Sequence, residues 1–165
     1  MSLPGRPKLD KLDQRILATV YRNARISKTQ MSDEVGLSAT RCAERMQRLE
    51  KSQIIRGYHA DIDFRLLARL SCFHVHVRLF DTTPPKMKQF EQAILTVDEI
   101  TSCQAVLGSV DYILMVLAPN TEAFQGVMDD LSMRESLKFD FTTFPVSKHI
   151  KSPHAVSLLA LIEHA

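Results

Sequence analysis

Apolar residues in the first third of the chain recur at the three-to-four-residue spacing that is typical of amphipathic helices. The first such repeat follows Asp10, a residue type that serves well as an N-cap, and predicts a helix over residues 11–23. Two further repeats predict shorter helices over residues 28–35 and 39–51. The first third of the chain is therefore expected to consist of three helices.

The residues around the second helix carry signals for its beginning and its end. Ser27 and Gln30 have the spacing of a capping box, in which each side chain binds the backbone N–H of the other residue. Gly36 permits a sharp turn at the end of the helix, and Ser38 can cap the third helix. Two short helices joined by such a turn are the pattern of a helix-turn-helix.

The third helix has an outer face that is polar and basic. Its inner stripe consists of Cys42, Met46 and Leu49, and the opposite side carries Thr40, Arg41, Glu44, Gln47 and Arg48, with Arg45 at the boundary. A helix fits the major groove of DNA, and an arginine can donate two hydrogen bonds to a guanine. We expect the bases to be read by Thr40, Arg41, Glu44 and Arg48, and the DNA backbone to be bound by Ser38 and Arg45. The alternative is a three-helix bundle whose arginines are merely solvated.

The stretch after the third helix, residues 54–62, contains β-forming residues that alternate loosely with polar ones. This pattern predicts a small hairpin, or wing, that completes a winged helix-turn-helix domain over residues 1–60. Residues 61–70 are then expected to form a linker or hinge, and residues 71–165 a second domain.

The second domain shows the two-residue alternation of a half-buried strand, which buries Phe73, Val75, Val77 and Leu79. Thr83, followed by Pro84, is expected to cap the next helix. Farther along, the pattern predicts two strands joined at a glycine turn, then a helix and a last strand, over residues 100–107, 111–118, 121–132 and 137–150.

This order of strands and helices is that of a ferredoxin-like βαββαβ domain, so the whole chain is expected to be an α+β protein. The two helices of such a domain cover only one face of its sheet. A second copy of the chain is the natural cover for the other face, and a two-fold dimer also suits a helix-turn-helix that reads palindromic DNA.

The composition indicates how charge is distributed along the chain and which cellular compartment is expected. Residues 1–60 carry 12 Lys and Arg against 6 Asp and Glu, whereas the rest carries 9 against 13, so the first half is the one expected to meet a polyanion. Three cysteines, Cys42, Cys72 and Cys103, form no close pair and suit a reducing cytoplasm. No apolar run is long enough to span a bilayer, so no membrane partner is expected.

Several segments together resemble the Lrp/AsnC (feast/famine) family of transcriptional regulators. Residues 9–17, the third helix and residues 55–58 resemble the DNA-binding domain of the family. The turn at residues 108–112 resembles its sensing domain, as do residues 141–143 and 148–151 in the last strand. The resemblance extends over residues 9–158 in the right order, which makes it far more specific than any single motif.

The resemblance implies a bacterial or archaeal transcription factor that binds double-stranded operator DNA in the nucleoid and senses an amino acid. It also implies a homodimer that can assemble further into tetramers or octamers. The effector-binding residues that it implies are Gly108, Ser109, Val110, Asp111, Tyr112, Thr142 and Thr143. In that role the glycine exposes backbone N–H groups to a carboxylate, the aspartate binds an ammonium and the threonines orient either group. The alternative is a plain β-turn with Asp111 capping its own backbone, and threonines that are ordinary strand residues.

Two positions depart from the pattern of the family. Gln53 stands where the family usually has glycine after the third helix, and a left-handed backbone at that position would be strained by about 1 kcal/mol. Ala68 stands where the hinge of the family usually has glycine.

Three other kinds of protein compete with this interpretation. A metal-responsive regulator would use Cys72, His74 and His76, which share one strand face, together with Cys103. An enzyme is disfavoured because the sequence has no Ser/His/Asp set, phosphate-binding glycine loop or paired carboxylates, and no cofactor is expected. A chromatin-like protein that binds DNA with little regard to sequence is the third alternative.

Overall fold

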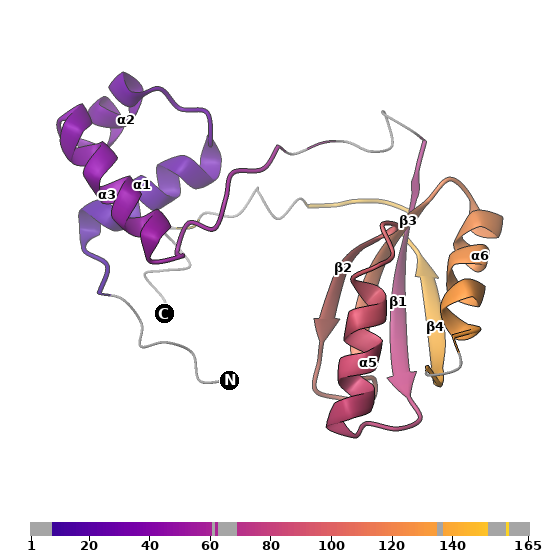
Figure 1. Ribbon diagram of the computed structural model, residues 1–165. Coiled ribbons are helices and arrows are strands. Elements are labelled where there is room, and N and C mark those ends of the chain that lie inside the picture. The colour runs from indigo at the N-terminus through magenta and orange to yellow at the C-terminus, as the bar shows by residue number, and fades with distance from the viewer. Residues whose placement is uncertain (1–7, 61, 63–68, 135–136, 152–157, 159–165) are drawn as a thin grey trace. The chain divides into compact units, whose positions relative to one another are not determined.

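The first three helices follow the predicted order and begin and end close to the predicted residues. The computed structural model describes residues 8–60, 62, 69–134, 137–151 and 158. The helices are α1 (Lys11–Arg22), α2 (Lys28–Val35) and α3 (Ala39–Lys51) (Figure 1). They enclose a core of seven buried apolar residues: Ile16, Val20, Met31, Val35, Cys42, Leu49 and Ile55.

The predicted caps explain why these helices begin and end where they do. Ser27 Oγ accepts a hydrogen bond from the Gln30 N–H at 3.2 Å, and Gln30 Oε1 accepts one from the Ser27 N–H at 3.2 Å. Gly36 ends α2 in the left-handed conformation, with φ 76° and ψ 35°. Because a side chain disfavours this conformation and glycine does not, the sharp turn between α2 and α3 follows from the sequence.

The segment after α3 differs from the prediction, because residues 54–60 contain no strand. The backbone N–H groups of Ile54 and Ile55 donate to the Leu49 carbonyl, at 3.0 and 3.2 Å, at the end of α3. Ile55 is buried in the helical core, so the segment bonds to the helix end in place of a partner strand. The predicted hairpin is therefore wrong for these residues, and Asp61 lies outside the described part of the chain.

The second half forms a four-stranded antiparallel sheet with two helices (Figure 1). The elements are β1 (Ser71–Leu79), α5 (Pro84–Ile94), β2 (Ile100–Ala105), β3 (Tyr112–Ala118), α6 (Thr121–Ser132) and β4 (Phe139–Pro145). The strand order is β2-β3-β1-β4, which places β1 and β3 in the middle. The predicted βαββαβ order and the α+β fold class are confirmed.

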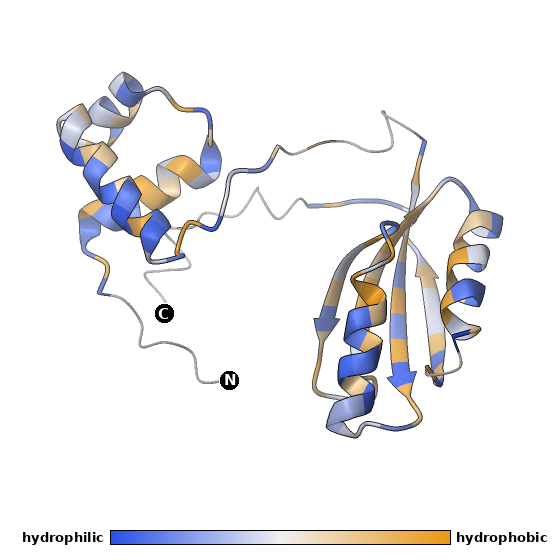
Figure 2. Cartoon of the chain, viewed as in Figure 1, coloured by the Kyte–Doolittle hydropathy of each residue, from blue (hydrophilic) through white to orange (hydrophobic). Residues whose placement is uncertain are grey.

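One face of this sheet forms the second hydrophobic core. β1 and β3 contribute alternate residues to it, among them Val75 and Leu114, and the alternation along the sheet is visible in Figure 2. Both α5 and α6 pack on that face, with Phe90 and Met128 fully buried. The period-two pattern of the sequence thus separated the covered face from the uncovered one correctly.

Two details of the second half correct the prediction. Thr83 has N-cap geometry, but its side chain makes no capping hydrogen bond; its N–H instead donates to Asp81 Oδ1 at 2.9 Å. The last strand, expected over residues 137–150, ends at Pro145. It ends there because Pro145 pairs with Phe73 near the start of β1, so the residues beyond have little of β1 left to pair with.

The chain divides into two compact units, with one division between residues 61 and 62 and another between residues 149 and 150. The boundaries predicted at residues 60 and 70 lie on either side of the first division, and the predicted domains stay a prediction. Ala68, the expected hinge position, lies outside the described residues. No helix in the described part of the chain is long and apolar enough to cross a bilayer.

Candidate functional site

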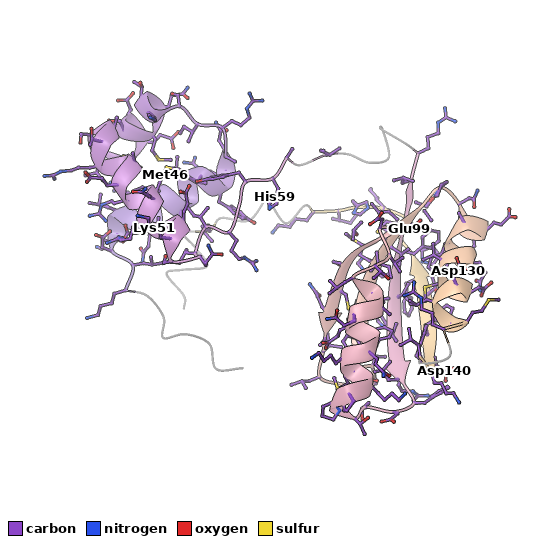
Figure 3. The ribbon with its side chains drawn as sticks, in the orientation of Figure 1. Met46, Lys51, His59, Glu99, Asp130 and Asp140 are labelled. Carbon is purple, nitrogen blue, oxygen red and sulfur yellow. The ribbon has the colours of Figure 1, made fainter. Side chains whose placement is uncertain are left out.

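The outward face of α3 presents the polar side chains that the sequence predicts. Thr40, Arg41, Glu44 and Gln47 are exposed, whereas Cys42 and Leu49 on the opposite side are buried in the helical core. Met46 is half-buried on the same helix, and Lys51 lies at its end (Figure 3). The tight packing of one side of α3 therefore fixes which of its side chains meet the solvent.

The start of α3 is held by its own cap. Ser38 Oγ accepts a hydrogen bond from the Arg41 N–H at 3.4 Å, a long bond for a cap. The first backbone N–H groups of a helix, together with such a hydroxyl, can bind a phosphate oxygen. Ser38 therefore caps α3, and the phosphate contact expected of it stays a prediction.

Arg45 and Arg48 are engaged within the protein, which sequence reasoning did not foresee. Arg45 Nη1 lies 2.7 Å from both Asp10 Oδ2 and Asp13 Oδ1, and Arg48 Nη2 lies 2.5 Å from Asp13 Oδ2. Asp13 is only 1% exposed although it carries a charge. Buried carboxylates are tolerated when they are paired and hydrogen-bonded, so this cluster fixes α1 against α3.

Hydrogen bonding and charge in this cluster also shift the proton affinities of its members. The backbone N–H of Asp13, followed by the Arg45 side chain, holds the pKa of Asp10 below its usual value. Hydrogen bonds from Arg45 to Asp10 and Asp13 raise the pKa of Arg45 in turn. The sequence signals part of this cluster, because Asp13 makes the first turn of α1 acidic and Arg48 makes the last turn of α3 basic.

Tyr58, which sequence reasoning did not single out, fastens the segment after α3 to the helix itself. Its hydroxyl donates to Glu50 Oε1 at 2.6 Å. Burial, together with this hydrogen bond, raises the pKa of Tyr58 to about 12. Tyr58 therefore holds the segment that follows α3 near the end of this helix.

In the second unit, the predicted effector turn lies between β2 and β3, and its aspartate is structural. Asp111 Oδ2 accepts a hydrogen bond from the Leu79 N–H at 2.8 Å, and the Asp111 N–H donates to the Val77 carbonyl at 2.9 Å. Asp111 thus ties the turn to the end of β1. Gly108 has φ 157°, and a Cβ built there would have open space around it.

Tyr112 is also used within the protein. It is 1% exposed, and its hydroxyl donates to Glu91 Oε1 at 3.1 Å. Burial, followed by this hydrogen bond, raises the pKa of the Tyr112 hydroxyl. Its ring packs 4.8 Å from Phe90, between centroids, which makes it part of the core.

The two threonines of the predicted site lie on opposite faces of the sheet. Thr142 pairs with His76 on the uncovered face, and Thr143 pairs with Val75 on the face that the helices cover. β1 also separates β4 from β3, so Thr142 lies two strand spacings, about 10 Å, from β3. A single chain therefore does not bring the seven predicted effector residues together.

The uncovered face of the sheet, here called the open face, combines apolar and imidazole side chains. It contains Ile113, Met115 and Leu117 of β3, which are half-buried, with His74 and His76 of β1 and Phe144 of β4. The rings of His76 and Phe144 lie 4.8 Å apart, between centroids. Phe144 is 49% exposed, so this face offers apolar surface to a partner.

The metal-binding alternative loses its fourth ligand in this arrangement. Cys72, His74 and His76 belong to one face of β1, but Cys103 pairs with Leu114, whose side chain lies on the covered face. Within the described residues, no three such side chains gather around one point. Burial also raises the pKa of the Cys72 thiol, which disfavours the thiolate that a metal needs.

Two family models match the chain. A winged helix-turn-helix DNA-binding model matches residues 9–56, and the Lrp/AsnC ligand binding domain matches residues 72–156. The first covers the three helices of the N-terminal unit, and the second covers the sheet except for Ser71, together with its two helices.

Characterised relatives match along nearly the whole chain. The transcriptional regulatory protein DoeX of Halomonas elongata is 31% identical over 148 residues, which cover 90% of this chain and 94% of DoeX. The leucine-responsive regulatory protein of Escherichia coli is 32% identical over 148 residues, which cover 90% of each chain.

Solved structures agree with these matches. A transcriptional regulator from Neisseria meningitidis, determined as a complex with L-methionine, superposes with a TM-score of 0.84 at 26% identity, covering 93% of this chain and 99% of its own. An AsnC family regulator from Agrobacterium tumefaciens has the same fold, with a TM-score of 0.80 at 23% identity, covering 87% and 94% of the two chains.

Proposed function

Because this chain belongs to the Lrp/AsnC family of transcriptional regulators, we propose that it binds operator DNA through the exposed side of α3 and senses a small molecule through its sheet domain. It is a DNA-binding regulator with a ligand-binding domain. The observation that carries the docking proposal is the polar face of α3, which is exposed while its other side is locked in the core.

In this docking, the side chains of α3 divide into two groups. Thr40, Arg41 and Glu44 enter the major groove and contact base edges, and Ser38 binds a phosphate at the start of the helix. Arg45 and Arg48 stay bound to α1 and add positive charge beside the DNA backbone. The ion pairs thus favour a positioning role for Arg48 over the base contact that the helical wheel alone predicts.

Replacement of Arg41 tests the docking. Arg41→Ala is expected to weaken binding to the specific operator by about 1–3 kcal/mol and to relax the preference at one base pair. Affinity is measured by titration at fixed salt, on operator sites recovered by selection of bound DNA. The control is Lys88→Ala, which removes one exposed positive charge from α5 in the other unit and is expected to change little.

Unchanged operator affinity in Arg41→Ala would refute this docking. If Arg41→Ala weakened binding to all sequences alike and flattened the dependence on salt, Arg41 would be a phosphate contact. A wild-type protein that binds every sequence equally would instead support the chromatin-like alternative.

We further propose that the small molecule is an amino acid, bound at the turn of residues 108–112 with Thr142 and Thr143. Two relatives support this class of ligand: one is named a leucine-responsive regulator, and another was determined with L-methionine. Since one chain does not bring these residues together, the site would lie near a contact between subunits. Binding is tested by thermal-shift measurements with each of the twenty amino acids.

The subunit contact that we propose is a homodimer through the open face, which can assemble further into tetramers or octamers. Its half-buried apolar residues and the exposed Phe144 favour burial against a like surface. We also propose that the protein acts on nucleoid DNA in the cytoplasm and catalyses no reaction, as expected of a transcription regulator.

A further inference from the structure

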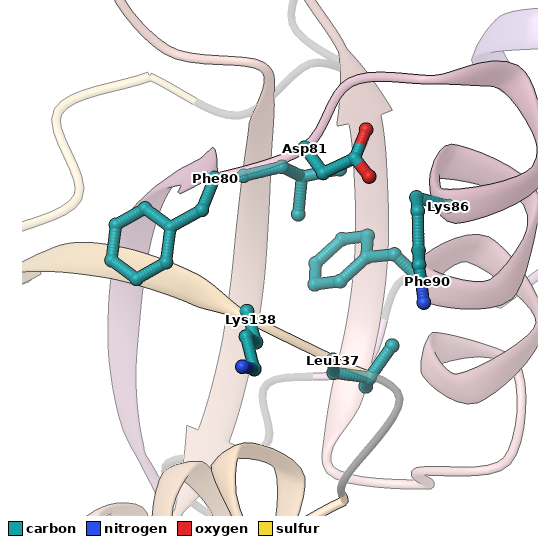
Figure 4. A pocket seen from close by; sticks show the side chains of 7 residues that line it. Phe80, Asp81, Lys86, Phe90, Leu137 and Lys138 are labelled. Carbon is teal, nitrogen blue, oxygen red and sulfur yellow. The ribbon is translucent and has the colours of Figure 1, made fainter.

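A cavity of about 230 Å³ opens in the sheet domain, away from the residues proposed for the effector. It lies where β1 ends, α5 begins and the chain enters β4, and its lining residues are Leu79, Phe80, Asp81, Lys86, Phe90, Leu137 and Lys138 (Figure 4). None of the seven proposed effector residues lines it.

The floor of the cavity is apolar and belongs to the core. Phe90 is fully buried, and Leu79 and Leu137 are less than one tenth exposed. The backbone fixes the wall, because the Phe80 N–H donates to the Lys138 carbonyl at 3.1 Å. The floor of the cavity is therefore formed by buried apolar residues on which a small apolar body can pack.

The rim carries two positive charges and one negative charge. Lys86 reaches the cavity from α5, and Lys138 from the residues just before β4 (Figure 4). Among the described residues, neither ammonium group forms an ion pair within 4.0 Å. Asp81 Oδ1 accepts the Thr83 N–H, and this hydrogen bond, with a smaller contribution from the charge of Lys86, lowers the pKa of Asp81. The rim thus has one net positive charge beside an apolar floor.

We propose that this cavity binds a small organic anion, a carboxylate attached to a small apolar body. The apolar body rests on Phe90, Leu79 and Leu137, and the carboxylate lies between Lys86 and Lys138. Small-molecule sites commonly combine a mostly apolar lining with a few placed polar groups, and this cavity is somewhat smaller than their usual range of about 300–1,000 Å³, which limits it to a small ligand.

The site does not depend on the proposed effector site, but one backbone contact connects the two. Leu79 lines the cavity, and its N–H is the donor that Asp111 accepts in the turn. If a bound anion shifts the end of β1, this displacement would therefore be transmitted to the turn through a single hydrogen bond.

The test titrates the full-length protein with 4-methylpentanoate, with the methyl resonances of Leu79 and Leu137 as reporters. Acetate lacks the apolar body and is expected to bind at least about tenfold more weakly. The neutral 4-methylpentanamide lacks the charge and is expected to bind about fivefold more weakly. The variants Lys86→Gln and Lys138→Gln are each expected to bind 4-methylpentanoate about fivefold more weakly than the wild type does. Lys88→Gln, an exposed lysine of the same helix that does not line the cavity, is the matched control and should leave the affinity unchanged.

Three results would overturn the proposal: absence of binding at millimolar acid, equal binding of the amide, or full affinity in both lysine variants. Repeating the titration in Asp111→Asn separates the two sites, because this variant should retain the binding of 4-methylpentanoate. If Asp111→Asn lost this binding while both lysine variants retained full affinity, the anion would be assigned to the turn instead. Operator binding is measured separately and does not bear on this site.

Discussion

Asp111 has a structural contact within the chain and a proposed role in ligand binding. One of its carboxylate oxygens accepts the Leu79 N–H, which is the capping role that a plain β-turn requires. A carboxylate has further lone pairs, so an ammonium group could still bind to it. Its contact with β1 is thus compatible with both interpretations of the turn.

Asp111→Asn distinguishes these interpretations, since an amide oxygen can still accept the Leu79 N–H while the charge is lost. If the turn binds an amino acid, the variant should weaken that binding by about 1.5–3 kcal/mol and leave effector-free DNA binding intact. Calorimetry on the wild type and the variant measures the difference. If no amino acid binds the wild type at millimolar concentration, the turn is only structural.

Tyr58 makes a prediction about pH. Its pKa rises from the ordinary value of 10.0 to about 12 in the folded protein, chiefly through burial and then through Glu50. A raised folded pKa means that the stabilisation is fully present below pH 10 and is lost as the pH rises toward 12. Urea unfolding of the wild type and Tyr58→Phe should therefore differ at pH 8 and converge toward pH 12. A difference that stays constant over this range would contradict the prediction.

Gln53 is a residue whose backbone carries strain. Its φ of 58° is left-handed, as expected from the position where the family usually has glycine. The side chain partly offsets this strain, because its Nε2 donates to the Glu50 carbonyl at 3.2 Å.

At the scale of elements, the contact between α1 and α3 depends on Asp13. This carboxylate is buried and pairs with Arg45 and Arg48, although both arginines remain partly exposed. Helical periodicity placed Arg48 on the outer face of α3 and Arg45 at its boundary, and in the structure Arg48 is exposed and Arg45 is half-buried.

Asp13→Asn is expected to destabilise the protein by about 1–2 kcal/mol, because two guanidinium groups lose a charged partner while solvent around Arg48 limits the loss. Asp33→Asn, which removes an exposed carboxylate from α2, is the control and should change the free energy of unfolding little. Both are measured by urea denaturation. Equal effects of the two variants would show that the ion pairs do not hold α1 against α3.

At the scale of the whole molecule, the open face predicts assembly. Two helices cover one side of the sheet, and the other side retains half-buried Ile113, Met115 and Leu117. The wild type should therefore sediment as a dimer or a larger species at micromolar concentration, and Met115→Glu should shift it toward monomer. The argument for a two-fold operator would be removed if the wild type were monomeric. It would also be removed if Met115→Glu sedimented like a dimeric wild type.

Helices and strands were largely predictable because their signals are local. Caps, glycine turns and hydrophobic periodicity lie within a few residues of the element that they control, so α1, α2 and α6 begin and end within one residue of the prediction. The predictions of a hairpin and of a longer last strand were wrong because a strand exists only where it has a partner. Ile54 and Ile55 bond to the end of α3, and β1 leaves little for the chain beyond Pro145 to pair with.

The sequence by itself therefore determined the order of elements, the fold class and the outward face of α3, since each depends on neighbours along the chain. Tertiary structure alone decided what the charged side chains do. Arg45 and Arg48 meet Asp10 and Asp13 from more than thirty residues away, and Asp111, just before β3, meets Leu79 at the end of the neighbouring strand β1. Such pairs form only when packing brings distant segments within hydrogen-bond distance, and no periodicity in the sequence encodes that distance.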